Sequence, residues 1–162
     1  MAILPSLSCK VSNGSRDDEA FDDPRIEACL LPHSGEKNVM LDKPKTVLLV
    51  DKQPNEIVYF TKQLAIAGFA ISVNQTGAGA IKSIKEHASD VVLLEIDLSD
   101  MDGIDVVKAI RENPDRAQTP IIAISAFPYM KARCMDNGCN AFIQKPVKAL
   151  ELITQLRKLT RG

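Results

Sequence analysis

Residues 91–103 read VVLLEIDLSDMDG, in which four apolar residues lead to Glu95 and then to a loop with three aspartates. A short, wholly apolar run of this composition is typical of a strand that is covered on both faces. Four similar runs occur elsewhere: TVLLVD (46–51), FAISVN (69–74), PIIAIS (120–125) and AFIQ (141–144). With DVVLLE (90–95), the chain therefore predicts five buried strands.

The segments between these runs carry apolar residues at spacings of three and four, which predicts amphipathic helices. We expect helices over 55–67, 79–87, 104–111, 129–137 and 148–159. The fourth should be short, because Gly138 suits the position that ends a helix. Its exposed side should carry Lys131 and Arg133, with Met130 and Met135 nearby. Alternating strands and helices predict an α/β fold with a parallel sheet between two helix layers.

Polar side chains occur where four of the predicted strands end. Asp51 and Lys52 follow the first strand, Glu95 ends the third, Ser125 ends the fourth and Lys145 follows the fifth. In a parallel sheet of this kind, ligands bind at the carboxyl ends of the strands. A single polar residue at such a position is common, but two carboxylates, a hydroxyl and an ammonium together predict one polar pocket.

The pocket residues lie in four segments that resemble the receiver domain of bacterial two-component response regulators. These segments are LLVDKQP (48–54), VVLLEIDLSDMDG (91–103), AISA (123–126) and NAFIQKP (140–146). They occur in the family's order and spacing across residues 46–160. The resemblance implies the flavodoxin-like (βα)5 receiver fold, a five-stranded parallel sheet in the order 2-1-3-4-5 with helices on both faces.

The resemblance also implies a role for each pocket residue. Glu95 stands where the family has its phosphorylated Asp, and Asp51 stands at the first position of the acidic pair. Lys52 stands at the second position, which is normally an Asp that binds Mg²⁺. Ser125 matches the switch hydroxyl that contacts the phosphoryl group, and Lys145 matches the lysine that pairs with the phosphorylated carboxylate.

Four further residues complete the implied site. Phe142 matches the aromatic side chain that changes rotamer on activation. Asp97 stands where the family usually lends a backbone carbonyl, and Ser99 replaces the usual Pro of the loop that ends at Gly103.

Two departures from the family pattern predict that the pocket does not accept a phosphoryl group. Lys52 replaces a carboxylate by an ammonium, and each unit charge pair at 4 Å is worth about 4 kcal/mol near a protein surface. Glu95 adds a methylene, whereas in-line transfer is sensitive to a displacement of about 1 Å. We therefore expect no resident metal or other cofactor, with Asp51 and Glu95 only as weak candidate ligands. A competing hypothesis adds Asp97 to these two as a third ligand.

The expected function is that of a single-domain atypical response regulator that signals by phosphorylation-independent contact with another protein. Lys52, Lys145 and Glu95 should form an internal ion network, because an unpaired buried charge is costly. Glu95 would then either imitate the phosphorylated state, by reaching toward Ser125 and Lys145, or only preserve the fold. On either reading the protein is not expected to be an enzyme.

Two alternatives stay open at this point. The chain could be a Mg²⁺-dependent phosphoacceptor that a histidine kinase phosphorylates. It could also be a small flavodoxin-like cofactor-binding protein or enzyme, although DKQPN after the first strand is not a phosphate-cradling loop.

Composition divides the chain of 162 residues near Lys45. Residues 1–45 lack apolar periodicity and are expected to be a largely disordered tail, with one candidate helix over 24–31 that could dock a partner. Residues 46–162 form the expected receiver-like domain. The cysteines, Cys9, Cys29, Cys134 and Cys139, match no zinc pattern and are expected to be free thiols in a reducing, cytoplasmic compartment.

Charge and hydropathy restrict the expected partners. The formal net charge of -1 argues against nucleic-acid binding driven by bulk electrostatics. The sequence contains neither an apolar run long enough to span a membrane nor a signal peptide. A histidine kinase, a phosphorelay protein or an output protein is the expected partner, and the chain is expected to be a monomer or a weak dimer.

Overall fold

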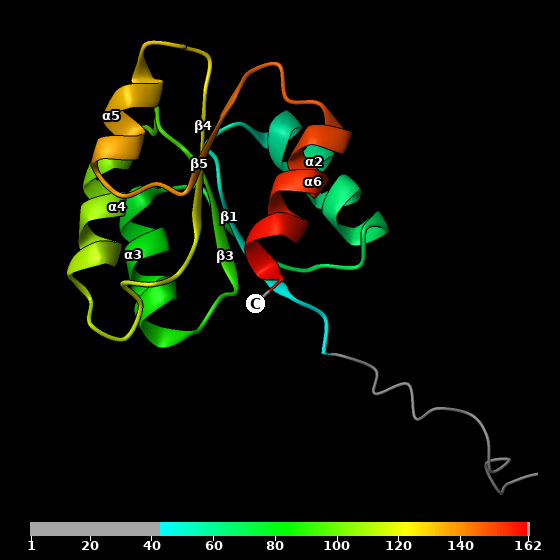
Figure 1. Cartoon of the computed structure of the whole chain (residues 1–162), viewed down its shortest axis with the longest axis horizontal. Coiled ribbons are helices and arrows are strands. Elements are labelled where there is room, and N and C mark those ends of the chain that lie inside the picture. The colour runs from blue at the N-terminus through cyan, green and yellow to red at the C-terminus, as the bar shows by residue number, and fades with distance from the viewer. Residues whose placement is uncertain (1–42, 162) are drawn as a thin grey trace, which may run out of the picture. The chain divides into compact units, whose positions relative to one another are not determined.

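The computed structural model describes residues 43–161 (Figure 1). Its five strands are β1 (Thr46–Val50), β2 (Ala70–Asn74), β3 (Val91–Glu95), β4 (Ile121–Ser125) and β5 (Ala141–Gln144). They form one parallel sheet in the order β2-β1-β3-β4-β5. The predicted strands and their order are confirmed, and all five carboxyl ends lie at the same edge of the sheet.

Each strand is followed by one helix: α2 (Pro54–Ile66), α3 (Gly77–Glu86), α4 (Gly103–Glu112), α5 (Met130–Asp136) and α6 (Ala149–Thr160). Helices α2 and α6 cover one face of the sheet, and α3, α4 and α5 cover the other (Figure 1). Helix α3 begins two residues before its predicted start. The Thr76 hydroxyl caps it by accepting a hydrogen bond from the backbone N–H of Gly79.

The central strands β1, β3 and β4 are buried on both faces, where successive strand side chains point in opposite directions. The prediction that all five strands are buried is wrong for β2, which lies at the edge of the sheet, has no buried residue and leaves Ser72 and Val73 exposed. Leu48, Val92, Leu94 and their neighbours pack against α3 and α4, whereas Val47, Leu49 and Leu93 pack against α2 and α6. Continuous apolar runs are therefore required in the central strands. The rigid core holds the residues that follow these strands in fixed positions.

Helix α5 has seven residues, which confirms the short helix that the sequence predicts. Gly138 follows it with a φ of +99°, a left-handed conformation that favours glycine. Lys131 and Arg133 are exposed, as predicted.

The two cysteines within the described residues, Cys134 and Cys139, are buried free thiols. Burial raises the pKa of Cys139 to about 12, which keeps this thiol protonated. The predicted helix over 24–31 and the remaining cysteines, Cys9 and Cys29, lie outside the described residues.

Candidate functional site

The carboxyl edge of the sheet places three polar side chains in the protein interior. Asp51, Glu95 and Ser125 are 1%, 4% and 1% exposed, although each belongs to or directly follows a strand of apolar residues. Buried carboxylates need partners, because leaving a charge unpaired away from water is costly. The contacts of these side chains therefore define the site.

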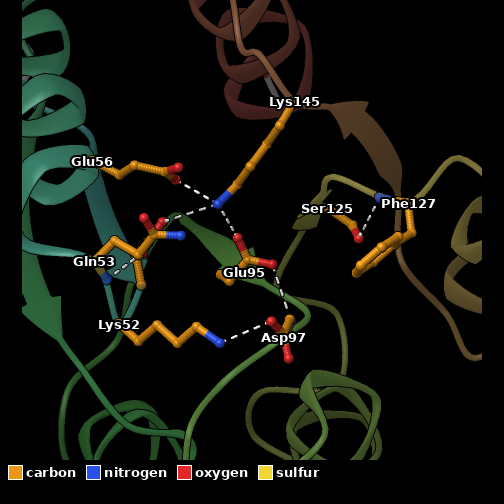
Figure 2. A network of polar contacts seen from close by, with 9 residues as sticks. Lys52, Gln53, Glu56, Glu95, Asp97, Ser125, Phe127 and Lys145 are labelled. Carbon is orange, nitrogen blue, oxygen red and sulfur yellow. Dashed lines mark hydrogen bonds and ion pairs between the residues drawn. The ribbon is translucent and has the colours of Figure 1, made fainter.

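Lys145 provides the main positive charge. Figure 2 shows its ammonium between the carboxylates of Glu56 and Glu95. Its Nζ atom forms an ion pair with Glu95 Oε2, lies 2.5 Å from Glu56 Oε2 and lies 3.9 Å from Asp51 Oδ2. The predicted contact between Lys145 and Glu95 is present, and Glu56 joins it as a residue that the sequence analysis did not identify.

The position of Glu56 in α2 explains why it reaches the pocket. It is the third residue of a helix that begins at Pro54, directly after the loop that carries Asp51. Side chains in a helix tilt toward its N-terminus, so an early residue can point back to the strand ends. The sequence signal that could have identified it is a glutamate at the second position of the first predicted helix, 55–67.

The three acidic side chains share one ammonium, and the pKa values of Asp51 and Lys145 are both raised in this group. Burial raises the pKa of Asp51 to about 6 against the opposing hydrogen bond from Gln53 and charge of Lys145, and Glu56 adds to the increase. Burial by itself lowers the pKa of Lys145. Hydrogen bonds to Glu56 and Glu95 and the charges of Glu95 and Asp51 outweigh this effect, so the net pKa of Lys145 is raised.

Lys52 does not join this network. The predicted ion network of Lys52, Lys145 and Glu95 is therefore confirmed for Lys145 and Glu95 but wrong for Lys52. The Nζ atom of Lys52 lies 2.8 Å from Asp97 Oδ2, away from Glu95 (Figure 2). The pairing is favoured because Asp97 is exposed, whereas an approach to Glu95 would require Lys52 to lose more of its water. Asp97 is likewise absent from the group of carboxylates around Lys145.

The loop after β3 is tied to its surroundings by three aspartates. The backbone N–H of Asp97 donates to Glu95 Oε1 at 3.0 Å. Asp100 accepts hydrogen bonds from the first two N–H groups of α3, those of Gly77 and Ala78. Asp102 caps α4 and pairs with Arg133 of α5 at 2.8 Å. The loop therefore connects the pocket to both α3 and α5.

Gly103 allows this loop to pack closely against β3. A Cβ atom at this position would lie 2.7 Å from Ile96 Cα and 2.9 Å from the backbone oxygens of Glu95 and Ile96. These atoms belong to the backbone and cannot rotate away, so the position requires glycine.

The side chains of Ser125 and Phe142 take no part in the contacts of the Lys145 ammonium, although the backbone N–H of Lys145 donates to the Ser125 carbonyl at 2.9 Å. The Ser125 hydroxyl accepts a hydrogen bond from the backbone N–H of Phe127 at 3.1 Å (Figure 2). Among the described residues, no hydrogen bond links Ser125 to Glu95. Of the two contacts expected for the Glu95 carboxylate, only the one with Lys145 is present. Phe142 is partly buried against the core that faces α4 and α5.

A cavity of about 420 Å³ opens beside Ser125. It lies between the loop after β3 and the loop after β4, and its lining includes Ser99, Asp97, Met101, Phe127 and Met130. Ser99 is exposed in this loop, and the cavity does not include Glu95 or Lys145. The cavity and the carboxylate group are therefore separate features.

The carboxylates fit a metal ion in number and chemistry. One oxygen each from Asp51, Glu56 and Glu95 lie within 4.8 Å of one another. Asp51 Oδ2 is buried and accepts no hydrogen bond from any residue in the described range 43–161. Mg²⁺ prefers oxygen ligands of this kind and would polarise phosphoryl oxygens when bound. The Lys145 ammonium, however, already contacts Glu56 and Glu95, so a bound metal ion would share these two carboxylates with it.

The fold and the site together define a class of signalling protein. The chain belongs to the response regulator receiver domain family, whose model matches residues 47–157. This assignment confirms the resemblance at the level of the family. It connects the chain to two-component signal transduction.

Two relatives illustrate the range of the family. The chain is 32% identical over 117 residues to the transcriptional regulatory protein KdpE of Mycobacterium tuberculosis, covering 71% of this chain and 50% of KdpE. It therefore spans about half the length of that relative. It is 26% identical over 116 residues to the polar-differentiation response regulator DivK of Brucella anthropi, covering 70% of this chain and 94% of DivK.

Solved structures share the fold at lower identity. The receiver domain of the sensor histidine kinase PA1611 from Pseudomonas aeruginosa, which has a magnesium ion coordinated in its active site cleft, superposes with a TM-score of 0.69. It is 24% identical and covers 74% of this chain and 100% of that domain. The chemotaxis response regulator CheY4 of Vibrio cholerae gives 0.68 at 23% identity, over 72% and 99% of the two chains.

None of the helices within residues 43–161 is long and apolar enough to cross a membrane.

Proposed function

We propose that this receiver domain signals through contact with a protein partner without being phosphorylated at Glu95. The observation that supports this proposal most directly is that both oxygens of the Glu95 carboxylate already have partners. Oε2 pairs with Lys145, and Oε1 accepts the N–H of Asp97. A carboxylate nucleophile has to leave these contacts before it can attack a phosphoryl group in line.

The length of the side chain supports the same proposal. A glutamate carries one methylene more than an aspartate, and the strand end that holds Glu95 is buried. The nucleophilic oxygen is therefore displaced by more than the roughly 1 Å that in-line transfer tolerates. Lys52 adds to this effect, because it offers no oxygen to a metal.

Glu95 can instead fix one conformation of the domain. Its ion pair holds Lys145, and its hydrogen bond holds the loop that reaches α3 and α5 through Asp100 and Asp102. We propose that a partner protein reads the surface fixed in this way. The partner is a histidine kinase, a phosphorelay protein or an output protein in the cytoplasm, and the chain acts as a monomer or weak dimer with residues 1–45 as a tail.

Phosphodonors test this proposal directly. The full chain is incubated with acetyl phosphate and Mg²⁺, and the intact mass is recorded without acid treatment. We expect no covalent phosphoryl adduct, and a Glu95→Asp variant measures how much the longer side chain contributes. An adduct on the wild-type chain that disappears in Glu95→Gln would overturn the proposal in favour of a Mg²⁺-dependent phosphoacceptor.

The conformational role of Glu95 needs a second measurement. Backbone NMR spectra of the wild type, Glu95→Ala and Glu95→Asp are compared around Ser125, Phe127 and Phe142. If Glu95 imitates the phosphorylated state, Glu95→Ala shifts these signals through the loop after β3. Identical spectra in this region would reduce Glu95 to a residue that only preserves the fold.

A further inference from the structure

We infer that Glu56 takes over the metal-ligand position that Lys52 leaves, so that Asp51, Glu56 and Glu95 form a rebuilt divalent-cation site. Glu56 belongs to α2, whereas the expected acidic pair lies in the loop before that helix. The inference goes beyond the proposed function, because a pocket can hold a cation without accepting a phosphoryl group.

The geometry places the three carboxylates around one point. Oxygens of Asp51, Glu56 and Glu95 lie within 4.8 Å of one another, and they come from the loop after β1, from α2 and from β3 respectively. Such a distance allows a single ion to contact all three, because metal–oxygen distances for Mg²⁺ and Ca²⁺ are roughly 2.0–2.6 Å. Asp97, which carries the charge nearest to Lys52, is not part of this group.

An unsatisfied oxygen gives an independent reason to expect a ligand. Asp51 is 1% exposed, and its Oδ2 atom receives no hydrogen bond within residues 43–161. Glu56 Oε2, in contrast, is partnered by the Lys145 ammonium at 2.5 Å. Buried polar atoms are rarely left without a partner, so the Asp51 oxygen indicates that a cation belongs beside it.

The charge balance leads to the same ligand class. Three carboxylates and the one ammonium of Lys145 leave two net negative charges in the pocket. Lys52 does not offset them, since Asp97 neutralises it at 2.8 Å. A divalent cation cancels this excess, and Glu56 restores the carboxylate that the sequence lost at Lys52.

Binding would change the contacts of Lys145. Its Nζ atom contacts Glu56 Oε2 and Glu95 Oε2 and lies 3.9 Å from Asp51 Oδ2. A cation that binds those oxygens has to share them with the ammonium, so the side chain of Lys145 must move. The signals of Lys145 therefore provide a readout that is independent of any phosphorylation.

The test is a titration of the full chain with Mg²⁺, followed by NMR in the absence of phosphodonors. We expect saturable shifts at Asp51, Glu56, Glu95 and the Lys145 side chain, and selective broadening of the same signals by Mn²⁺. Glu56→Gln, which keeps the size of the side chain, should weaken Mg²⁺ binding by about tenfold or more. The control Glu86→Gln removes an exposed carboxylate of α3 that lies 3.9 Å from Lys82, and should leave the affinity unchanged.

Two results would overturn the inference. One is the absence of saturable shifts in the wild type, and the other is an affinity that Glu56→Gln leaves unchanged. If Glu56→Gln does not fold, Glu56→Asp keeps the charge but shortens the reach and should still weaken binding. Because phosphodonors are absent, failure here leaves the proposed function intact, and a phosphoryl adduct in the earlier experiment leaves this site intact.

Discussion

The ammonium of Lys145 lies 2.5 Å from the Glu56 carboxylate, although the two residues belong to opposite ends of the domain sequence. The contact joins the segment after β5 to the first turn of α2 (Figure 2). Glu95 shares the same ammonium, so three separate segments meet at one charge. The stability and the chemistry of the pocket both depend on this ammonium.

Removing the ammonium should therefore destabilise the domain. Lys145→Met keeps most of the side-chain volume but leaves three carboxylates without their shared cation, and breaking a buried ion pair in this way costs about 3–5 kcal/mol. We expect a loss of this size in urea unfolding at neutral pH. It should shrink in acid, where the carboxylates become protonated.

The control for this variant is Lys131→Met, at an exposed position of α5. It should change the free energy of unfolding by no more than about 0.5 kcal/mol. Equal effects of the two substitutions would show that the Lys145 ion pairs contribute nothing specific to stability.

The ionised carboxylate of Asp51 should lower the free energy of unfolding at neutral pH. Burial raises its pKa to about 6 from an ordinary value of 3.8, so the folded state disfavours the ionised form. Between pH 3.8 and pH 6, the folded protein therefore binds more protons at Asp51 than the unfolded chain does. The free energy of unfolding consequently falls as the pH rises through this range.

We therefore expect Asp51→Asn to stabilise the domain by at most about 3 kcal/mol above pH 6, with little effect below pH 4. Urea unfolding across this pH range, in the presence of a chelator, measures the difference. A gain that is constant with pH would mean that the ionisation of Asp51 is not its cause.

Restoring the aspartates that the family carries at positions 52 and 95 should restore phosphoryl transfer to position 95. Lys52→Asp supplies the missing acidic position, and Glu95→Asp shortens the nucleophile. We expect the double variant to form an acid-labile phosphoryl adduct with acetyl phosphate and Mg²⁺, while each single variant stays close to the wild type. In-line transfer needs the metal and the nucleophile to be correct together.

The matched control combines Lys52→Asp with Glu95→Asn, which has a similar size but no nucleophilic carboxylate. An adduct on this control would place the phosphoryl group elsewhere. A double aspartate variant that folds and takes no phosphoryl group would show that other residues, Glu56 among them, block the reaction.

Gly103 should tolerate no side chain. The Cβ atom of Gly103→Ala would meet backbone atoms of Glu95 and Ile96 at 2.7–2.9 Å, and overpacking of this kind costs about 1–3 kcal/mol. Thermal unfolding should show this loss. Ser99→Ala, at an exposed position of the same loop, should stay within about 0.5 kcal/mol of the wild type.

Much of the pocket could be predicted from the sequence, because residues directly after the strands have little freedom of position. Asp51, Glu95, Ser125 and Lys145 follow apolar runs of fixed length, and parallel strands bring such ends to one edge. The partner of Lys52 could not be predicted in this way. Its long side chain can reach more than one carboxylate, and only the folded position of the loop after β3 brings Asp97 within 2.8 Å of it.

The sequence by itself determined the five strands, the five helices, their parallel order and the family. The strands, the helices and their parallel arrangement follow from local patterns of apolar residues, whereas the strand order and the family follow from the resemblance of four motifs to receiver domains. The tertiary structure alone decided that Glu56 enters the pocket and that three carboxylates surround Lys145. This depends on the direction in which α2 leaves the sheet, which brings residues distant in sequence within the few ångströms over which ionic contacts act.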